Sequence, residues 1–344
     1  MGRVRHNRRV RPSPHRSAAR PLAAATLACV LLAGCGSGDT SVQDRASDTN
    51  VFAERAQTLV EKPRLEAAAK QAAGDGDAQE ASALERLART PTGIWLTPES
   101  YGTDQVGAYV TQVVAATEAL TVPLFVLYGI PDRDCTGGFS AGGLTADTYL
   151  PWVQAIADVL ANAGTDTAAV LEPDALAGSV ACGPTDRTSL LRQALQTLVT
   201  AGVATYVDAG HSDWIPASEM APLLEKVGVS SARGFATNVA NYQPVARERA
   251  YAAELSGLLD GAHYVIDVGR SGDPSGTGEP VTDWCNPVDR ALGEDPGFVD
   301  DDTALDALLW IKPPAESDGE CHGGPAAGEV WVDRAASLAS AAGW

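Results

Sequence analysis

The chain has 344 residues, which is enough for one large α/β domain or for two smaller ones. It carries 25 basic and 44 acidic side chains. Seven basic residues and no acidic one precede Cys35, which leaves 18 basic against 44 acidic residues, or a charge of −26, beyond it. This balance argues against nucleic acids and anionic surfaces as partners and suits a neutral ligand.

The first 35 residues have the character of an export signal. Seven arginines precede an apolar Ala/Leu run from Leu22 to Ala33, which is too short to span a membrane. The run ends in Leu32-Ala33-Gly34-Cys35, which resembles the lipobox of bacterial lipoproteins, where Cys35 would be lipidated. We therefore expect an exported lipoprotein anchored at the outer face of the cell membrane, or a secreted protein if the lipobox is not used. Residues 36–50 are rich in Ser, Asp, Gly and Thr and predict a flexible tether.

Setting aside Cys29 and Cys35, four cysteines remain, namely Cys135, Cys182, Cys285 and Cys321. An even number of cysteines in an exported protein predicts two disulfides. Their spacing contains no paired CxxC pattern of the kind that binds zinc, so a metal site is the weaker interpretation.

A helical pattern begins at Val51, is interrupted by Gly74–Asp77 and resumes through Leu84–Leu87. From Gly93 onward, strands and amphipathic helices alternate. In the stretch Tyr149–Ala163, for example, one helical face carries four apolar residues, Trp152, Val153, Ile156 and Leu160. In Leu190–Ala201 the corresponding face carries Leu191, Leu195, Leu198 and Val199.

Seven candidate strands lie between these helices: Gly93–Thr97, Pro123–Ile130, Ala168–Glu172, Thr205–Asp208, Gly234–Val239, Tyr264–Asp267 and Ala307–Ile311. Alternating β and α units imply a parallel sheet with right-handed crossovers. The predicted fold class is therefore α/β, with a closed or nearly closed parallel barrel like a TIM barrel. An open doubly wound sheet is the alternative, but no GxGxxG follows the first strands.

Polar side chains follow nearly every candidate strand. In Val170-Leu171-Glu172-Pro173-Asp174, two acids follow an apolar run, and Pro173 should stop the strand. The other strand-end residues are Trp95, Asp132, Arg133, Asp134, Asp208, His211, Asn238, Asn241, Asp267, Arg270, Lys312, Glu316 and Asp318. In a β/α barrel these positions converge on the rim where active sites lie. So many charges in one cleft are costly unless they serve a function, which predicts an enzyme.

Paired carboxylates without a thiol nucleophile, a phosphate-binding loop or an obvious metal cage indicate acid/base hydrolysis. Glycoside hydrolysis is the leading case. Two other chemistries remain open at this point. Asp208, His211 and Asp267 could form a metal site, although a lone Asp/His pair is weak evidence. Ser140 could be a nucleophile, but it lacks a Gly-x-Ser-x-Gly elbow.

Four tryptophans lie at or just beyond strand ends: Trp95, Trp214, Trp284 and Trp310. Sugar rings expose C–H faces that stack on aromatic faces, so these residues fit a carbohydrate ligand. Core packing is the alternative role for each of them.

Seven stretches of the chain carry a family resemblance, in order along the sequence. They are Tyr128–Cys135 with Ser140–Gly143, Leu171–Asp174, Tyr206–Trp214, Gly234–Tyr242, Val265–Arg270, Trp284–Pro287 and Trp310–Gly319. The first two resemble the signatures of glycoside hydrolase family 6, the cellulases once called family B, and the others match further blocks of that family. The similarity runs from about Val51 to Trp344.

The resemblance implies a distorted β/α barrel of about seven strands that hydrolyses β-1,4-glucan with inversion at the anomeric carbon. The general acid would be Asp174, and Asp134 would help to keep it protonated, because two carboxyls that share a site cannot both ionise cheaply. Asp318 matches the proposed base, which acts on the water directly or through a relay that includes Ser140. Tyr128 matches the tyrosine beside the distorted sugar at the cleavage point.

Further matches concern binding and covalent links. The substrate-binding positions would be Trp95, Asp208, His211, Trp214, Asn238, Trp284, Lys312 and Glu316. The resemblance also implies the disulfides Cys135–Cys182, between the two acidic loops, and Cys285–Cys321, between the loop beside Trp284 and the loop after Asp318. No metal or organic cofactor is expected.

The stretch from Cys285 to Cys321 is short, which resembles open-cleft endoglucanases more than cellobiohydrolases, whose longer loops roof a tunnel. We therefore expect cleavage of internal β-1,4-glucosidic bonds in cellulose or soluble β-glucan. The alternatives are a cellobiohydrolase of the same family and a non-catalytic glucan-binding lipoprotein. In this interpretation residues 1–35 are the signal, 36–50 the tether and 51–344 the catalytic domain of a monomer.

Overall fold

The computed structural model describes residues 48–135, 137–182 and 187–344. The predicted export signal, Cys35 and all but the last three residues of the tether lie outside these residues. Among the helices of the described part, none is long and apolar enough to cross a membrane.

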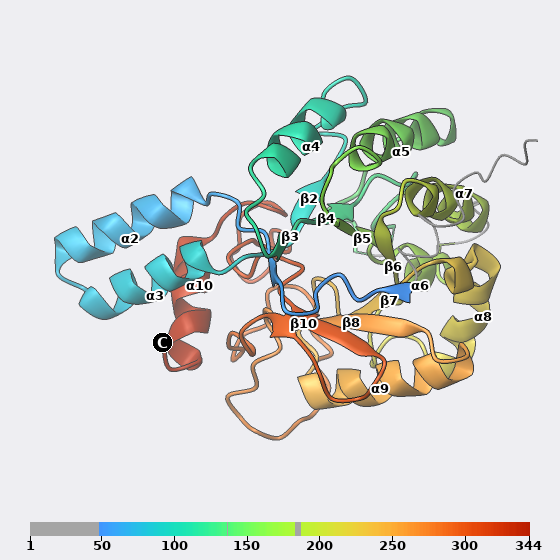
Figure 1. Cartoon of the computed structure of the whole chain (residues 1–344). Helices are drawn as coiled ribbons and strands as arrows, with labels where there is room; N and C mark the ends of the chain where they lie inside the picture. The colour runs from blue at the N-terminus through green and yellow to red at the C-terminus, as the bar shows by residue number, and fades with distance from the viewer. Residues whose placement is uncertain (1–47, 136, 183–186) are drawn as a thin grey trace, which may run out of the picture. The chain divides into compact units, whose positions relative to one another are not determined.

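Within the described residues, eight strands form one curled sheet (Figure 1). In spatial order they are β2 (Ile94–Leu96), β4 (Leu124–Leu127), β5 (Ala168–Leu171), β6 (Ala204–Asp208), β7 (Gly234–Thr237), β8 (His263–Asp267), β10 (Leu305–Leu309) and β9 (Gly297–Phe298). The first seven pair in parallel, and β9 pairs antiparallel with β10. The predicted parallel α/β architecture and its seven strands are therefore confirmed.

The sheet is a distorted barrel because its first and last parallel strands do not form a ladder with each other. The N–H of Gly93 donates to the carbonyl of Trp310 at 2.8 Å. The side-chain amide of Gln57 then bonds both backbone groups of Trp310, each at 3.2 Å. Gln57 belongs to β1 (Ala56–Gln57), which pairs with β3 (Thr121–Val122) in a separate two-stranded sheet.

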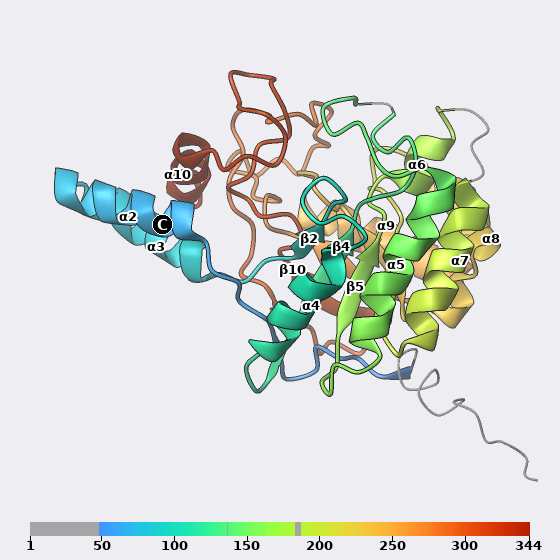
Figure 2. The same ribbon diagram turned by 90° about the horizontal axis from the view of Figure 1, so that it is seen from above.

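Helices cover the outer face of the sheet, and Figure 2 shows three of them, α5, α7 and α8, side by side. The covering helices are α4 (Val106–Ala115), α5 (Ala146–Leu160), α7 (Arg187–Thr200), α8 (Ala217–Val227) and α9 (Val245–Leu258). The predicted apolar faces of α5 and α7 are buried, including Trp152, Ile156, Leu195 and Leu198. Inside the barrel a second core of mostly small side chains, such as Val126, Val170 and Ala236, surrounds Tyr206 and Phe52.

Two helices, α2 (Pro63–Asp75) and α3 (Ala78–Arg89), form a hairpin that extends away from the sheet, with α10 (Val332–Ala341) packed against α3 (Figure 1). Gly76 ends α2 in the left-handed conformation with φ of 88°. The Asp77 side chain then accepts the N–H of Glu80 and caps α3. The predicted helical start at Val51 is wrong, because Gln57 is held in β1 by Trp310 and Pro63 begins α2.

Candidate active site

A cavity of about 320 Å³ lies at the carboxyl ends of the parallel strands. Ten of the thirteen residues predicted for catalysis or substrate binding line it: Trp95, Tyr128, Asp134, Ser140, Asp174, His211, Trp214, Trp284, Lys312 and Asp318. The fold thus gathers at one rim Trp95 of β2 and polar and aromatic groups that follow five other strands. This is the position at which barrel enzymes hold their catalytic residues.

Asp174 lies just beyond β5, where the chain turns sharply into the short helix α6 (Ala175–Ser179). Glu172 and Asp174 have φ angles of 52° and 68°, in the left-handed region that costs a non-glycine residue about 1 kcal/mol or more. The strand ends at Leu171, so the prediction that it includes Glu172 is wrong by one residue. The turn holds the Asp174 backbone against Asp208, whose carboxylate accepts the Asp174 N–H at 2.9 Å.

The environment of Asp174 favours its protonated form. Burial raises the pKa of Asp174 well above its usual range, and the negative charges of Asp208, Asp134 and Asp318 raise it further. The ammonium group of Lys312 opposes this shift. A carboxyl group that keeps its proton near neutral pH is suited to act as a general acid.

Asp134, which also lines the cavity, is held by backbone donors of its own loop. Its two carboxylate oxygens accept the N–H of Gly137 at 3.0 Å and the N–H of Ser140 at 2.6 Å. The buried guanidinium of Arg133 donates to the carbonyls of Ser140 and Tyr128, at 2.9 and 2.7 Å. Arg133 therefore ties the loop that carries Asp134 and Ser140 to the end of β4.

Asp318 is buried in a network of three donors. Its Oδ1 accepts a hydrogen bond from Arg270 at 2.8 Å, and its Oδ2 accepts from the Tyr242 hydroxyl at 2.7 Å and from the N–H of Asn286 at 3.1 Å. The side chains of Arg270 and Asp318 are only 2% and 6% exposed. This ion pair fixes the orientation of Asp318 and leaves it little freedom to approach a water molecule directly.

Aromatic and basic side chains form the rest of the wall. The rings of Trp95 and Tyr128 meet edge to face at 5.4 Å, and the Lys312 ammonium lies 5.1 Å from the Trp95 ring centroid. The ring centroids of His211 and Trp214 are 5.6 Å apart. Burial lowers the pKa of His211 to about 4, so its ring is neutral at pH 7. The aromatic rings can stack against sugar faces, and the polar groups can bond sugar hydroxyls. A ligand for this wall therefore does not need to carry a charge.

Three predicted binding residues do not line the cavity. Asp208 is 1% exposed and lies behind Asp174. Asn238 is fully buried, and its amide donates to the carbonyl of Asp267 and to Ser271 Oγ. Glu316 forms an ion pair with Lys312 at 3.2 Å from outside this cavity. Asp208 and Asn238 therefore hold the rim from behind the cavity, and their predicted contact with substrate stays a prediction.

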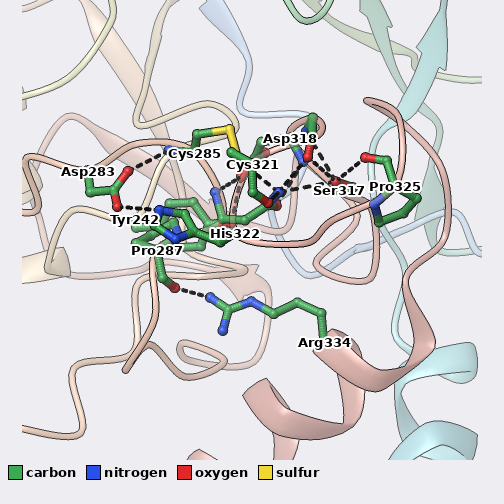
Figure 3. Close-up of a disulfide and its surroundings, with 12 residues drawn as sticks. Tyr242, Asp283, Cys285, Pro287, Ser317, Asp318, Cys321, His322, Pro325 and Arg334 are labelled. Carbon is green, nitrogen blue, oxygen red and sulfur yellow. Dashed lines mark hydrogen bonds and ion pairs between the residues drawn. A yellow bond between two sulfur atoms is a disulfide. The ribbon is translucent and has the colours of Figure 1, made fainter.

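Both predicted disulfides form. Cys135–Cys182 has a Cα–Cα distance of 6.0 Å and links the loop after Asp134 to the segment after α6. Cys285–Cys321, with a Cα–Cα distance of 6.2 Å, joins the loop of Trp284 to the loop of Asp318 (Figure 3). Beside the second bridge, the side-chain amide of Asn286 donates to the carbonyl of Gly319 at 2.9 Å. Each bridge therefore constrains a pair of loops that carry cavity residues.

Two residues that build the site, Glu172 and Asp267, were not among the predicted catalytic or substrate-binding residues. Glu172 accepts the N–H groups of Gly129 and Ile130, each at 3.0 Å, and so holds the segment after Tyr128. Asp267 accepts the N–H of Lys312 at 2.9 Å. In the sequence, the only sign of this role was the position of both residues at the ends of predicted strands. Their bonding to the backbone of the adjacent strand's loop becomes visible only in three dimensions.

The residues that the structure describes contain no group of three or more His, Cys, Asp or Glu side chains placed to hold a metal ion. The metal site considered for Asp208, His211 and Asp267 has no support in their arrangement, since the carboxylates of Asp208 and Asp267 accept backbone N–H groups.

Residues 52–342 match the family model described as glycosyl hydrolases family 6. Endoglucanase A of Cellulomonas fimi is 42% identical over 265 residues, which cover 76% of this chain and 56% of that protein. Probable 1,4-beta-D-glucan cellobiohydrolase C of Aspergillus niger is 30% identical over 283 residues, covering 69% of this chain and 61% of that protein. The aligned region thus spans less than two thirds of either relative.

A solved structure provides the corresponding comparison in three dimensions. The endoglucanase Cel6 from Mycobacterium tuberculosis, in complex with a methyl-cellobiosyl-4-deoxy-4-thio-β-D-cellobioside, matches with a TM-score of 0.77 and 38% identity. The match covers 86% of this chain and 100% of that chain. With the family model and the relatives above, this shows that the chain belongs to glycosyl hydrolases family 6.

Proposed function

We propose that this protein is an endo-β-1,4-glucanase that hydrolyses internal β-1,4-glucosidic bonds in cellulose or soluble β-glucan with inversion. The observation that carries the proposal is Asp174, a buried carboxyl group whose pKa is raised by burial and by three neighbouring carboxylates, in a cavity lined by Trp95, Trp214 and Trp284. A proton donor among aromatic platforms is the arrangement that glycoside cleavage requires.

In the proposed reaction Asp174 donates its proton to the glycosidic oxygen as the C1–O bond breaks. A water molecule attacks C1 from the opposite face and loses a proton, which gives inversion. Asp134 raises the pKa of Asp174 and holds the Ser140 segment. Because Asp318 already accepts three hydrogen bonds, we assign it to receive the proton through a relay that includes Ser140. Tyr128 would contact the sugar at the cleavage point.

Endo action is favoured over exo action by two observations. The relatives named endoglucanase reach 42% and 38% identity, against 30% for the cellobiohydrolase. The Trp284 side chain lines the cavity, and this residue is 40% exposed, which favours an open cleft over a roofed tunnel. Viscosity of carboxymethylcellulose tests this assignment: a rapid fall with few new reducing ends supports endo action, and a slow fall with many reducing ends contradicts it.

The proposal also covers how the enzyme is exported and attached to the cell. Residues 1–35 would direct export, Cys35 would carry a lipid anchor, residues 36–50 would form the tether, and residues 51–344 would act as a monomeric catalytic domain. The acidic balance and the disulfides support export of a domain with a neutral substrate. Metabolic labelling with a fatty acid, lost on Cys35→Ala, would support the anchor, and no labelling would contradict it.

A further inference from the structure

A second cavity, also of about 320 Å³, adjoins the catalytic cavity. Trp95 lines both of them. The walls of the second cavity come from residues 60–65 before and at the start of α2, from residues 92–95 at β2, from Tyr109 of α4 and from the loop after β10. Its volume lies at the lower end of the range of roughly 300–1,000 Å³ typical of small-molecule sites.

The boundary between the two cavities is formed by charged and aromatic groups. Lys312 lines the catalytic cavity and Glu316 lines the second one, and their charged groups pair at 3.2 Å. The Lys312 ammonium also lies 5.1 Å from the centroid of the Trp95 ring. A ligand that rests on Trp95 in the first cavity can therefore meet Glu316 in the second.

Contacts within the domain hold two of the residues that line the second cavity, Tyr109 and Lys62. The Tyr109 ring stacks on Tyr101 with centroids 3.9 Å apart and an interplanar angle of 9°. The Lys62 ammonium donates to the carbonyls of Leu87 and Thr90 and so fixes the segment before α2 to the end of α3. The wall therefore presents a supported aromatic side chain, Tyr109, toward the cavity.

Two further lining residues, Glu61 and Arg64, are exposed at the solvent side of this cavity. Neither side chain forms a hydrogen bond or an ion pair within the part of the chain that the structure describes. Aromatic side chains together with carboxylate and guanidinium groups recognise the alternating apolar and hydroxyl surfaces of a pyranose.

We propose that this second cavity is an additional glucan subsite, which binds the part of the same β-1,4-glucan chain that extends past Trp95. The inference rests on the proposed function and deepens it. An enzyme that cleaves internal bonds must hold a chain that continues beyond both sides of the cleavage point. The second cavity provides the continuation on the Trp95 side, with Tyr109 as its platform and Glu61, Arg64 and Glu316 as hydroxyl partners.

If Tyr109 belongs to a subsite, its removal should slow hydrolysis of long cello-oligosaccharides more than that of short ones. A purely structural role for Tyr109 predicts no such difference. In Tyr109→Ala, kcat/KM on cellohexaose should fall about 5-fold or more, whereas kcat/KM on cellotetraose should stay within a factor of two. Tyr109→Phe keeps the ring and should behave as the native protein. The exposed pair Glu61→Ala/Arg64→Ala should show the same length-dependent loss without unfolding the domain.

Tyr101→Phe is the matched control, because it keeps the ring that stacks on Tyr109 and changes a residue outside the cavity lining. It should leave the ratio of kcat/KM on cellohexaose and cellotetraose unchanged. Equal losses on both substrates in Tyr109→Ala, or unchanged hydrolysis of cellohexaose in both Tyr109→Ala and the Glu61/Arg64 pair, would overturn the subsite.

Calorimetry separates failure of the subsite from failure of the proposed function. Cellohexaose should bind the single variant Asp174→Asn, which keeps Tyr109, about 5-fold more tightly than the double variant Tyr109→Ala/Asp174→Asn. Equal affinities would overturn the subsite even if the native protein cleaves glucan. A native protein that binds cellohexaose but never cleaves it would instead contradict the proposed function.

Discussion

The backbone N–H of Asp174 donates to the carboxylate of Asp208 at 2.9 Å, although Asp208 lies behind the cavity wall. The same Asp208 oxygen accepts the N–H of Gly210 at 3.1 Å. Burial raises the pKa of Asp208 to about 7, against the effect of these two donors. Asp208 therefore acts on the acid in two ways: it fixes the backbone of Asp174, and when ionised its charge raises the pKa of Asp174.

Removal of this charge should move the pH profile. In the proposed mechanism Asp174 must be protonated to donate, so activity should be lost as pH rises through its pKa. Asp208→Asn lowers that pKa, and the alkaline limb of kcat should move to lower pH by about one unit or more. Asp213→Asn, which removes an exposed acid of the same cavity, should leave the limb in place. An unmoved alkaline limb in Asp208→Asn would contradict this role.

Arg270 should be essential for stability because it compensates the buried charge of Asp318. Arg270→Met leaves that carboxylate without its ion-pair partner, and urea unfolding should show a loss of about 3–5 kcal/mol. The double variant Arg270→Met/Asp318→Leu removes both charges and should recover much of the loss. A single variant within about 1 kcal/mol of the native protein, or a double variant less stable than the single one, would argue against this account.

The disulfide Cys135–Cys182 should matter more for activity than for folding. It joins residues 47 apart in sequence, and the chain-entropy estimate gives it roughly 4 kcal/mol of stabilisation. In Cys135→Ser/Cys182→Ser, kcat should fall at temperatures where circular dichroism still reports a folded domain, because Asp134 and Asp174 lose their common support. Loss of activity only in parallel with unfolding would show that the bridge acts through stability alone.

The stability of the domain should fall as pH rises toward neutrality. Burial raises the pKa of Glu172 from its ordinary 4.5 to about 7, so the folded state binds a proton that the unfolded state releases between these values. The proton on Glu172 adds on the order of 1–3 kcal/mol to the free energy of unfolding. This contribution is complete below about pH 4.5 and is lost as pH approaches 7. Unfolding free energies at pH 5 and pH 7.5 measure it, and Glu172→Gln should flatten the slope. A slope that is the same in both proteins would exclude Glu172 as its source.

Much of the architecture was predictable because buried parallel strands and amphipathic helices leave periodic apolar patterns. All seven parallel strands follow such patterns, and the strand ends together with the family resemblance marked ten of the residues that line the cavity. The two-residue strands β1, β3 and β9 carry no usable periodicity. Their pairing depends on partners far away in the sequence, which local patterns do not report.

The parts of the site that could not be predicted depend on the direction of side chains. Glu172 and Asp174 are two residues apart, but the left-handed turn at both positions sends Glu172 to the backbone of Gly129 and leaves Asp174 at the cavity. Asn238 has the residue type of a ligand contact, yet its amide is used by Asp267 and Ser271. Strand-end position alone does not distinguish a residue that touches substrate from one that supports the rim.

The central claim is that Asp174 delivers the proton in glycoside cleavage, and one pair of measurements tests it most directly. Turnover of cellohexaose by Asp174→Asn should fall by at least about 100-fold, the contribution expected of a general acid, while calorimetry shows that binding is kept within a few-fold of the native protein. An Asp174→Asn protein that cleaves cellohexaose at a rate close to the native one would contradict the account.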